Sequence, residues 1–149
     1  MDKIPRFFRK IAAFCTYQER CLSEVKEKLC EWEAESEEVH AIIEKLIDEK
    51  YIDEERFAKL YAGSKFRAKK WGKIKIKYML KQKKIPAALI SKALQEINAD
   101  TYYEVLKELT LQKKEAMQNN FDRAKLYNHL ISKGYENDLV REAINEVGK

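Results

Sequence analysis

The sequence repeats itself at a spacing of fifty residues, and the repeated positions follow the period of a helix. Residues 71–76, Trp-Gly-Lys-Ile-Lys-Ile, align without gaps with residues 121–126, Phe-Asp-Arg-Ala-Lys-Leu. Agreement at positions that helix periodicity buries is typical of a repeated packing unit. The downstream apolar pairs are Leu80 with Leu130, Leu89 with Leu139, Ile90 with Val140, Ala93 with Ala143, and Leu94 with Ile144.

A third copy of the pattern precedes these two. Val25 and Leu29 match Ile76 and Leu80, and the later apolar positions match after a four-residue insertion. Each copy therefore holds two short helices with the same apolar spacing. We expect a longer helix before each pair, over residues 5–16, 54–70 and 101–118.

Three helices in each of three copies predict an all-α fold. Tandem units of this size contact mainly their neighbours, which gives an elongated, curved array of three tandem three-helix repeats. The alternative is one compact bundle of about eight helices whose similar segments arose by chance. The predicted units cover residues 1–50, 51–98 and 99–149, and the first contains an acidic insertion at 31–38.

The composition agrees with helices throughout. Only four glycines and two prolines occur, and the residues that dominate are good helix formers. Pro86 is expected in the first turn of its helix, where proline is tolerated, and Gly72 and Gly134 are expected at turns. Side chains that suit an N-cap precede the apolar runs: Ser23, Ser36, Asp53, Asp122 and Asn137.

Several classes of protein do not fit this sequence. The longest stretch without a charge, residues 11–18, is far shorter than the roughly 20 residues of a membrane-spanning helix. No signal-peptide core is present, so a cytoplasmic location is expected. Cys15, Cys21 and Cys30 form no metal-binding pair, and we expect buried thiols.

No motif for catalysis is present. His40 and His129 lie far apart, and neither a phosphate-binding loop nor a nucleophile elbow occurs. We therefore expect no enzyme, no metal and no cofactor. The catalytic alternative, a nuclease, would have to rely on Asp53, Glu54 or Asp122, although the first two are better explained as acids at a helix start.

Positive charge is concentrated in the middle of the chain. Residues 65–84 hold ten lysines or arginines and no acid, and Phe66 and Trp71 are interleaved with them. Cations with aromatic side chains suit a nucleic-acid backbone and its bases, and they also suit an acidic protein surface. The alternative is a solvated face that keeps the protein soluble. The predicted binding residues are Lys65, Arg67, Lys69, Lys70, Lys73, Lys75, Lys77, Lys81 and Lys84.

The order of several short motifs resembles the RecX family, regulators of the bacterial RecA recombinase. Residues 51–58, Tyr-Ile-Asp-Glu-Glu-Arg-Phe-Ala, are similar to the family's Gly-Tyr-Ile/Leu-Asp-Asp-x-x-Phe-Ala segment. Residues 71–80 are similar to its Gly-x-x-x-Ile-x-x-x-Leu segment, and residues 130–135 to its Leu-x-x-x-Gly-Phe segment. Lys50 and Lys84 stand where the family usually has glycine, which puts the local turn geometry in question.

The resemblance implies a function as well as a fold. It implies a protein without catalytic activity that binds in the groove of the RecA–DNA filament. It further implies restraint of filament growth, ATP hydrolysis and strand exchange, with DNA contacted within the filament or weakly on its own. We expect a monomer and no membrane partner. The alternative is a stand-alone DNA-binding protein that uses the basic helices of the middle repeat.

Overall fold

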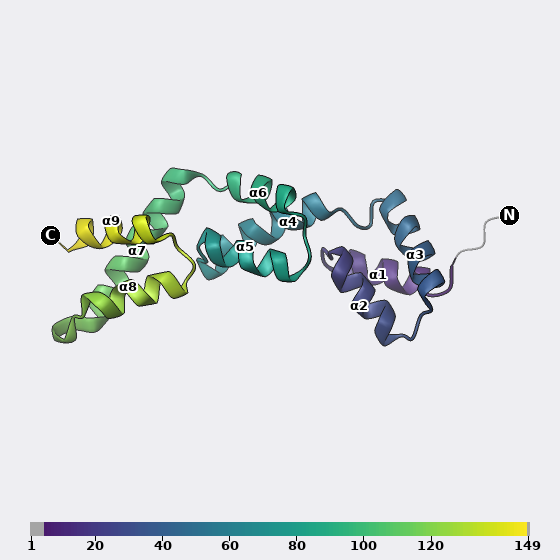
Figure 1. The fold of residues 1–149 in the computed structure, drawn as a ribbon, viewed down its shortest axis with the longest axis horizontal. Helices are drawn as coiled ribbons and strands as arrows, with labels where there is room; N and C mark the ends of the chain where they lie inside the picture. Colours follow the sequence, from purple (N-terminus) through teal and green to yellow (C-terminus); the bar gives the residue numbers. More distant parts are fainter. Residues whose placement is uncertain (1–4, 149) are drawn as a thin grey trace.

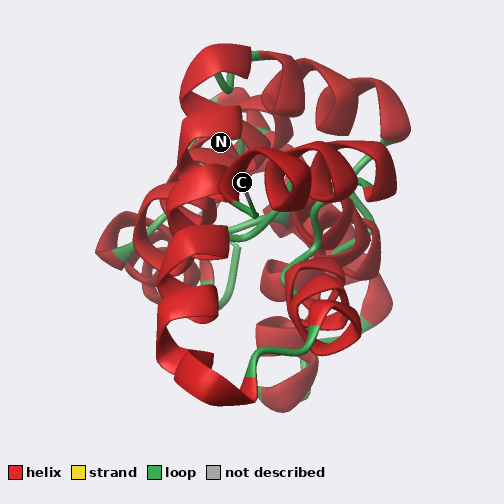
Figure 2. Cartoon of the chain, turned by 90° about the vertical axis from the view of Figure 1, so that its left-hand side faces the viewer, coloured by secondary structure: helices red, strands yellow, loops and turns green. Residues whose placement is uncertain are grey.

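The computed structural model describes residues 5–148, and within them the chain folds into nine α-helices joined by short turns. Figure 1 shows these helices as three triplets in an elongated row with a shallow arch. Seen from the C-terminal end, the described chain is helix and loop only (Figure 2). The prediction of a helical array is confirmed, and the compact bundle is wrong. The helices are α1 (Phe8–Tyr17), α2 (Leu22–Glu31), α3 (Ser36–Asp48), α4 (Glu54–Ser64), α5 (Lys73–Gln82), α6 (Ala87–Gln95), α7 (Ala99–Met117), α8 (Arg123–Ser132) and α9 (Asn137–Val147).

Helices α1–α3 form the N-terminal unit, α4–α6 the middle unit and α7–α9 the C-terminal unit. Packing between helices is concentrated inside these triplets. The bounds 1–50, 51–98 and 99–149 stay a prediction, and residues 1–4 and 149 lie outside the described residues.

The apolar cores divide the chain unequally. The N-terminal unit has a core of its own, built around Ile11, Leu29 and Leu46, which are fully buried. The middle and C-terminal units share one continuous core, which includes Leu80 and Leu130. Helices α4–α9 therefore form one packed body, and the N-terminal unit is a second.

A close backbone contact joins the middle and C-terminal units. The Gly72 N–H donates to the Lys133 carbonyl at 2.8 Å, and the Ile74 N–H donates to the Gly134 carbonyl at 2.9 Å. A Cβ atom on Gly72 would lie 2.3 Å from the Gly134 carbonyl carbon. Gly134 has a φ of 100°, which side-chain-bearing residues rarely adopt. The two glycines let these backbones meet.

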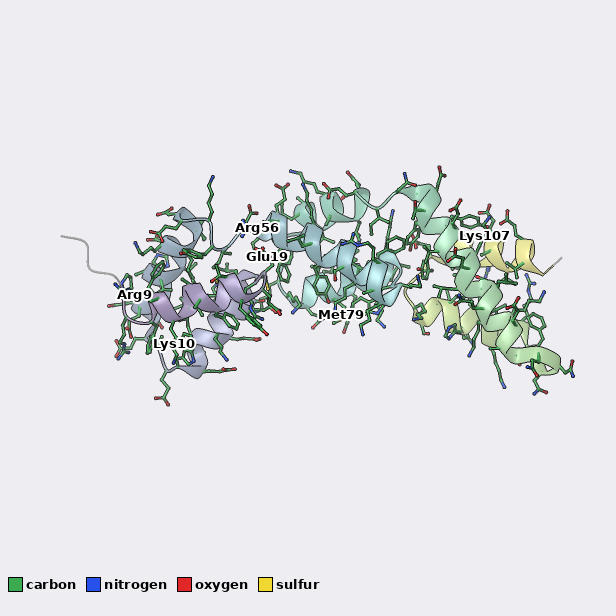
Figure 3. All side chains as sticks on the ribbon, turned by 180° about the vertical axis from the view of Figure 1, so that it is seen from behind. Arg9, Lys10, Glu19, Arg56, Met79 and Lys107 are labelled. Carbon is green, nitrogen blue, oxygen red and sulfur yellow. The ribbon has the colours of Figure 1, made fainter. Side chains whose placement is uncertain are left out.

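The contact between the N-terminal and middle units is mostly polar. The Ser23 hydroxyl donates to the Lys83 carbonyl at 2.8 Å, and the Lys83 ammonium lies 3.1 Å from the Glu24 carboxylate. Arg56 pairs with Glu19 at 2.7 Å, and Figure 3 shows these two side chains together where the units meet. The Cys21 side chain is an apolar exception, because it is buried in the core of the middle unit.

The N-cap residues of the helices agree only in part with those predicted from the sequence. Asp53 and Asp122 cap α4 and α8 as predicted, each accepting hydrogen bonds from first-turn N–H groups. Ser23, Ser36 and Asn137 lie inside the first turns instead, and Pro86 occupies the N-cap position before α6. Asn98, which was not among the predicted caps, is the N-cap of α7, and its side chain accepts from the Thr101 N–H.

The long helix predicted over residues 54–70 is interrupted. The α-helical part ends at Ser64, and Lys65–Lys69 form a wider π-turn that ends at Lys70 with a φ of 57°. The turn buries Phe66 in the shared core. It also presents the Lys70 carbonyl to the Tyr135 hydroxyl of the C-terminal unit at 2.9 Å. Lys50 and Lys84 both have a φ of 62°, so the left-handed turns persist without glycine.

The thiols differ in exposure, which corrects the expectation that all three are buried. Cys15 and Cys21 are buried, but Cys30 is exposed at the end of α2. Burial raises the pKa of Cys15 to about 11. We expect Ellman's reagent at neutral pH to modify one thiol per native chain, and the other two only in denaturant. The Cys30→Ala variant should show no fast reaction, and fast modification of a second thiol would contradict the burial.

Candidate functional site

The nine predicted binding residues form a basic surface on the middle unit, along the π-turn, α5 and their flanking turns. Arg67, Lys69, Lys77, Lys81 and Lys84 are exposed, and the other four are half-exposed. Among residues 5–148, Lys83 is the one cation of the 65–84 segment that pairs with a carboxylate. The nine residues of the basic surface therefore keep their charges available to a partner, whereas Lys83 is committed to the neighbouring unit.

The outer face of α5 combines charge with apolar side chains. Lys73, Lys77 and Lys81 are spaced four residues apart and lie along one side of the helix. Ile74 and Tyr78 lie beside them, with 54% and 60% of their surface exposed. Neither residue was predicted to belong to the binding surface. The sequence pattern that could have identified them is an apolar pair with helical spacing, on the side of α5 opposite the buried Ile76 and Leu80.

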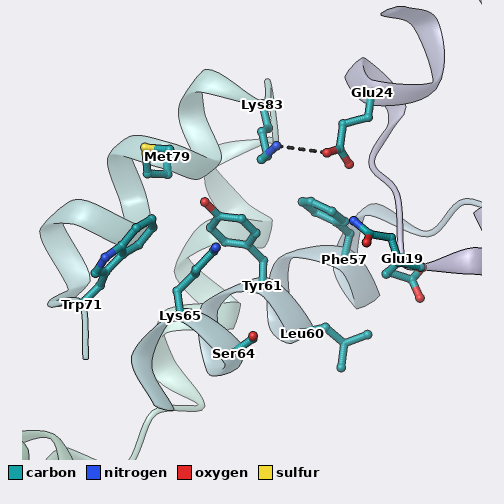
Figure 4. Close-up of a pocket in the computed structure, with 11 residues that line it drawn as sticks. Glu19, Glu24, Phe57, Leu60, Tyr61, Ser64, Lys65, Trp71, Met79 and Lys83 are labelled. Carbon is teal, nitrogen blue, oxygen red and sulfur yellow. Dashed lines mark hydrogen bonds and ion pairs between the residues drawn. The ribbon is translucent and has the colours of Figure 1, made fainter. Parts of the chain in front are cut away.

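A groove of about 460 Å³ lies next to the basic surface, between the end of α1 and helices α4 and α5. Its floor is aromatic, with Phe57, Tyr61 and Trp71 side by side (Figure 4). The Lys65 ammonium lies 5.1 Å from the Trp71 ring centroid and 5.4 Å from that of Tyr61. The repeat aligns Trp71 with Phe121, but neither is fully buried: Trp71 is half-buried and Phe121 is 43% exposed. Trp71 therefore packs on the core and also lines the groove.

The far wall of the groove carries carboxylates of the N-terminal unit that are paired with cations of the middle unit. Burial disfavours ionised Glu24, but hydrogen bonds from the Cys21 N–H and from Lys83 outweigh it, and the pKa of Glu24 is lowered. This stabilisation is complete above the ordinary carboxyl pKa of 4.5 and is lost as the pH falls through the lowered value. Nearby, burial raises the pKa of Glu54, whose Oε1 accepts from the Leu22 N–H while its buried Oε2 has no partner.

The carboxylates of the nuclease alternative do not form a site. Asp53 caps α4 in the middle unit and Asp122 caps α8 in the C-terminal unit, while Glu54 bonds to the start of α2. In the described part of the chain, no group of three histidines, cysteines or acids is placed to hold a metal ion. No helix within residues 5–148 is long and apolar enough to span a membrane.

The acidic segment 31–38 forms the α2–α3 connection and the start of α3. Glu38 pairs with Arg6 at 2.8 Å, and its carboxylate also accepts a hydrogen bond from the Glu35 N–H. These contacts tie part of the segment to its own unit. Such contacts are typical of a solvated loop and helix start, and they leave fewer free carboxylates for a basic partner.

Comparisons with known proteins point to one family. The model of the RecX second three-helix domain matches residues 53–94, which is most of the middle unit. Regulatory protein RecX of Clostridium tetani is 32% identical over 83% of this chain, and that of Prosthecochloris aestuarii is 26% identical over 87%. The chain spans 59% of the clostridial relative and 85% of the other.

Solved structures show the same fold. The crystal structure of RecX from Lactobacillus salivarius superimposes with a TM-score of 0.84 at 23% identity. The match covers 95% of this chain and 94% of that one. A second crystal structure, of regulatory protein RecX, gives a TM-score of 0.83 over 95% of this chain. The array of helix triplets is therefore a known arrangement.

Proposed function

Because the chain belongs to the RecX family of regulatory proteins, we propose that it binds a RecA filament on DNA and restrains it. It acts as a regulatory binding protein and not as an enzyme. In this proposal, the chain lies against the filament as a monomer and slows ATP hydrolysis, filament extension and strand exchange. An elongated body suits this task, because it can contact more than one subunit of a repeating surface.

The observation that carries the proposal is the uncompensated charge of the basic surface. Nine cations lie within twenty residues of the middle unit, and they have no carboxylate partner in the described structure. A filament wrapped around DNA offers phosphate groups and acidic side chains, and both attract such a surface. The proposed contact residues are therefore the nine residues of the basic surface.

A second candidate function is binding to bare DNA. Tyr78 supports it, because an exposed aromatic ring among lysines can stack on an unpaired base. The cations are mainly lysines, which suit phosphate contacts better than the reading of base edges. Binding of this kind would show little preference for sequence and would weaken steeply as the salt concentration rises.

Titration of RecA ATPase activity on single-stranded DNA tests the proposal. We expect inhibition at less than one copy of this protein per recombinase, because a regulator that blocks extension acts on many subunits. Binding to bare DNA, measured in parallel at two salt concentrations, should be much weaker. Full ATPase activity together with tight, salt-sensitive binding to bare DNA would instead support the second candidate.

A further inference from the structure

We propose that the groove between the N-terminal and middle units binds a protein segment that carries an aromatic or long aliphatic side chain beside a carboxylate. The inference rests on the proposed function, because the segment would belong to the protein surface of the filament. It adds a second kind of contact to the basic surface, and it assigns that contact to different residues.

The floor of the groove is suited to an apolar side chain. Phe57, Leu60 and Tyr61 lie on one face of α4 because they are spaced three and four residues apart. Leu60 contributes to the lining of the groove, and 51% of its surface is exposed. Met79 contributes a flexible thioether, which adapts to the shape of a partner. The volume lies within the range of roughly 300–1,000 Å³ that is common for binding sites.

The charges at the groove define the second feature of the segment. Lys65 lies above the aromatic floor and has no carboxylate partner among residues 5–148. The Lys75 ammonium lies 4.7 Å from the ring centroid of Trp71, which Lys65 also approaches. A carboxylate that follows the apolar side chain into the groove would therefore pair with Lys65. Lys83, whose ammonium lies 5.9 Å from the Tyr61 ring centroid, is already paired with Glu24, so the free positive charge belongs to Lys65.

The single uncompensated charge of the groove favours a protein segment over a nucleic acid. Glu19 and Glu24 line the groove from the side of the N-terminal unit, but Glu19 is paired with Arg56 and Glu24 with Lys83. Among the described residues, Lys65 is therefore the one cation lining the groove that has no carboxylate partner. A strand of nucleic acid carries a charge at every phosphate, and Lys65 could neutralise only one of them. A short segment with one carboxylate beside an apolar side chain matches both this single charge and the aromatic floor.

Photo-cross-linking with photo-methionine tests this inference with a minimal change of side chain. Met79 lines the groove, whereas Met117, equally half-buried, lies at the end of α7 in the C-terminal unit. Protein labelled at its methionines is bound to RecA–DNA filaments, sedimented and irradiated. Mass spectrometry then assigns each cross-link to one methionine and to protein or DNA.

We expect Met79 to cross-link to the recombinase, within or beside a segment that holds an apolar residue next to an acid. The yield from Met79 should exceed that from Met117 by about tenfold, since only the groove holds a partner segment in the complex. Cross-links from Met79 to DNA would overturn the inference, and so would filament-bound protein in which Met79 stays silent. Absence of sedimentation with the filament would instead overturn the proposed function.

A pair of matched variants gives an independent measure. Leu60→Arg places a long polar side chain over the groove, and Leu111→Arg makes the same change at a similarly exposed leucine of α7. We expect Leu60→Arg to weaken filament binding about tenfold, because the apolar side chain of the partner loses its site, and Leu111→Arg to leave binding unchanged. Tighter filament binding by Leu60→Arg would indicate a nucleic-acid occupant and would contradict the inference.

Discussion

Replacing Lys73, Lys77 and Lys81 by glutamate is expected to weaken the binding of this protein to a RecA filament about 100-fold. Each substitution reverses one charge on the outer face of α5 and turns an attraction for phosphate or carboxylate into a repulsion. About 1 kcal/mol for each reversed contact gives roughly 3 kcal/mol in total, which corresponds to a factor of about 100. The measurement is the concentration that halves the ATPase activity, together with co-sedimentation. The fold should survive, because Lys77 and Lys81 are exposed and a glutamate at the first position of α5 suits the helix dipole.

The matched control separates this site from net charge. The triple substitution changes the net charge from +5 to −1, since each lysine becomes a glutamate. Replacing Arg9, Lys113 and Lys125 by glutamate produces the same net charge from positions in the other two units. If the control variant loses as much inhibition as the α5 variant, long-range charge explains binding and the basic surface has no specific role. If neither variant loses inhibition, the basic surface is a solvated face.

Gly134→Ala is expected to destabilise the packed body of α4–α9 by about 3 kcal/mol. A side chain at a φ of 100° is strained, and the added Cβ would lie 2.3 Å from the Cβ of Lys75 and 2.7 Å from its backbone nitrogen. Backbone strain and overpacking each cost about 1–3 kcal/mol. The clash involves α5 itself, so the junction between the middle and C-terminal units must open to relieve it. Denaturant unfolding followed by circular dichroism measures the effect.

Gly63→Ala is the matched control for this substitution. Gly63 lies in α4 with ordinary helical dihedral angles, and its added Cβ would approach the movable end of the Arg67 side chain. Alanine favours a helix over glycine by about 1 kcal/mol, so this variant should be as stable as the parent or more stable. Equal losses from both substitutions would contradict a specific role for Gly134 in joining the two units.

Helix periodicity and the internal repeat were sufficient to predict the fold. Positions such as Leu80 and Leu130 could be identified as buried because apolar side chains recur there in register, and both are fully buried. The caps at Asp53 and Asp122 could be predicted because aspartate accepts hydrogen bonds from the free N–H groups of a first turn. The sequence also showed that the basic residues are concentrated between 65 and 84.

The π-turn and the groove could not be predicted in the same way. The π-turn that follows Ser64 is held by contacts that are distant in sequence, such as the hydrogen bond from the Tyr135 hydroxyl to the Lys70 carbonyl, 65 residues earlier. Likewise, the pairing of Lys83 with Glu24 joins two units and separates this lysine from its nine neighbours. A one-dimensional count of charges treats all ten cations alike. Only the arrangement of the units shows which of them are free.

The two separate cores also determine how this chain can come apart. Helices α4–α9 depend on one another through shared apolar packing, so they are expected to unfold as a single cooperative block. The N-terminal unit buries its apolar residues by itself, and a few hydrogen bonds and ion pairs fasten it to that block. Breaking these few contacts would separate the two bodies and leave most of both cores buried. In the proposed complex, such a joint would let one end of the protein stay bound to the filament while the other end adjusts to a change in the helical pitch of the filament.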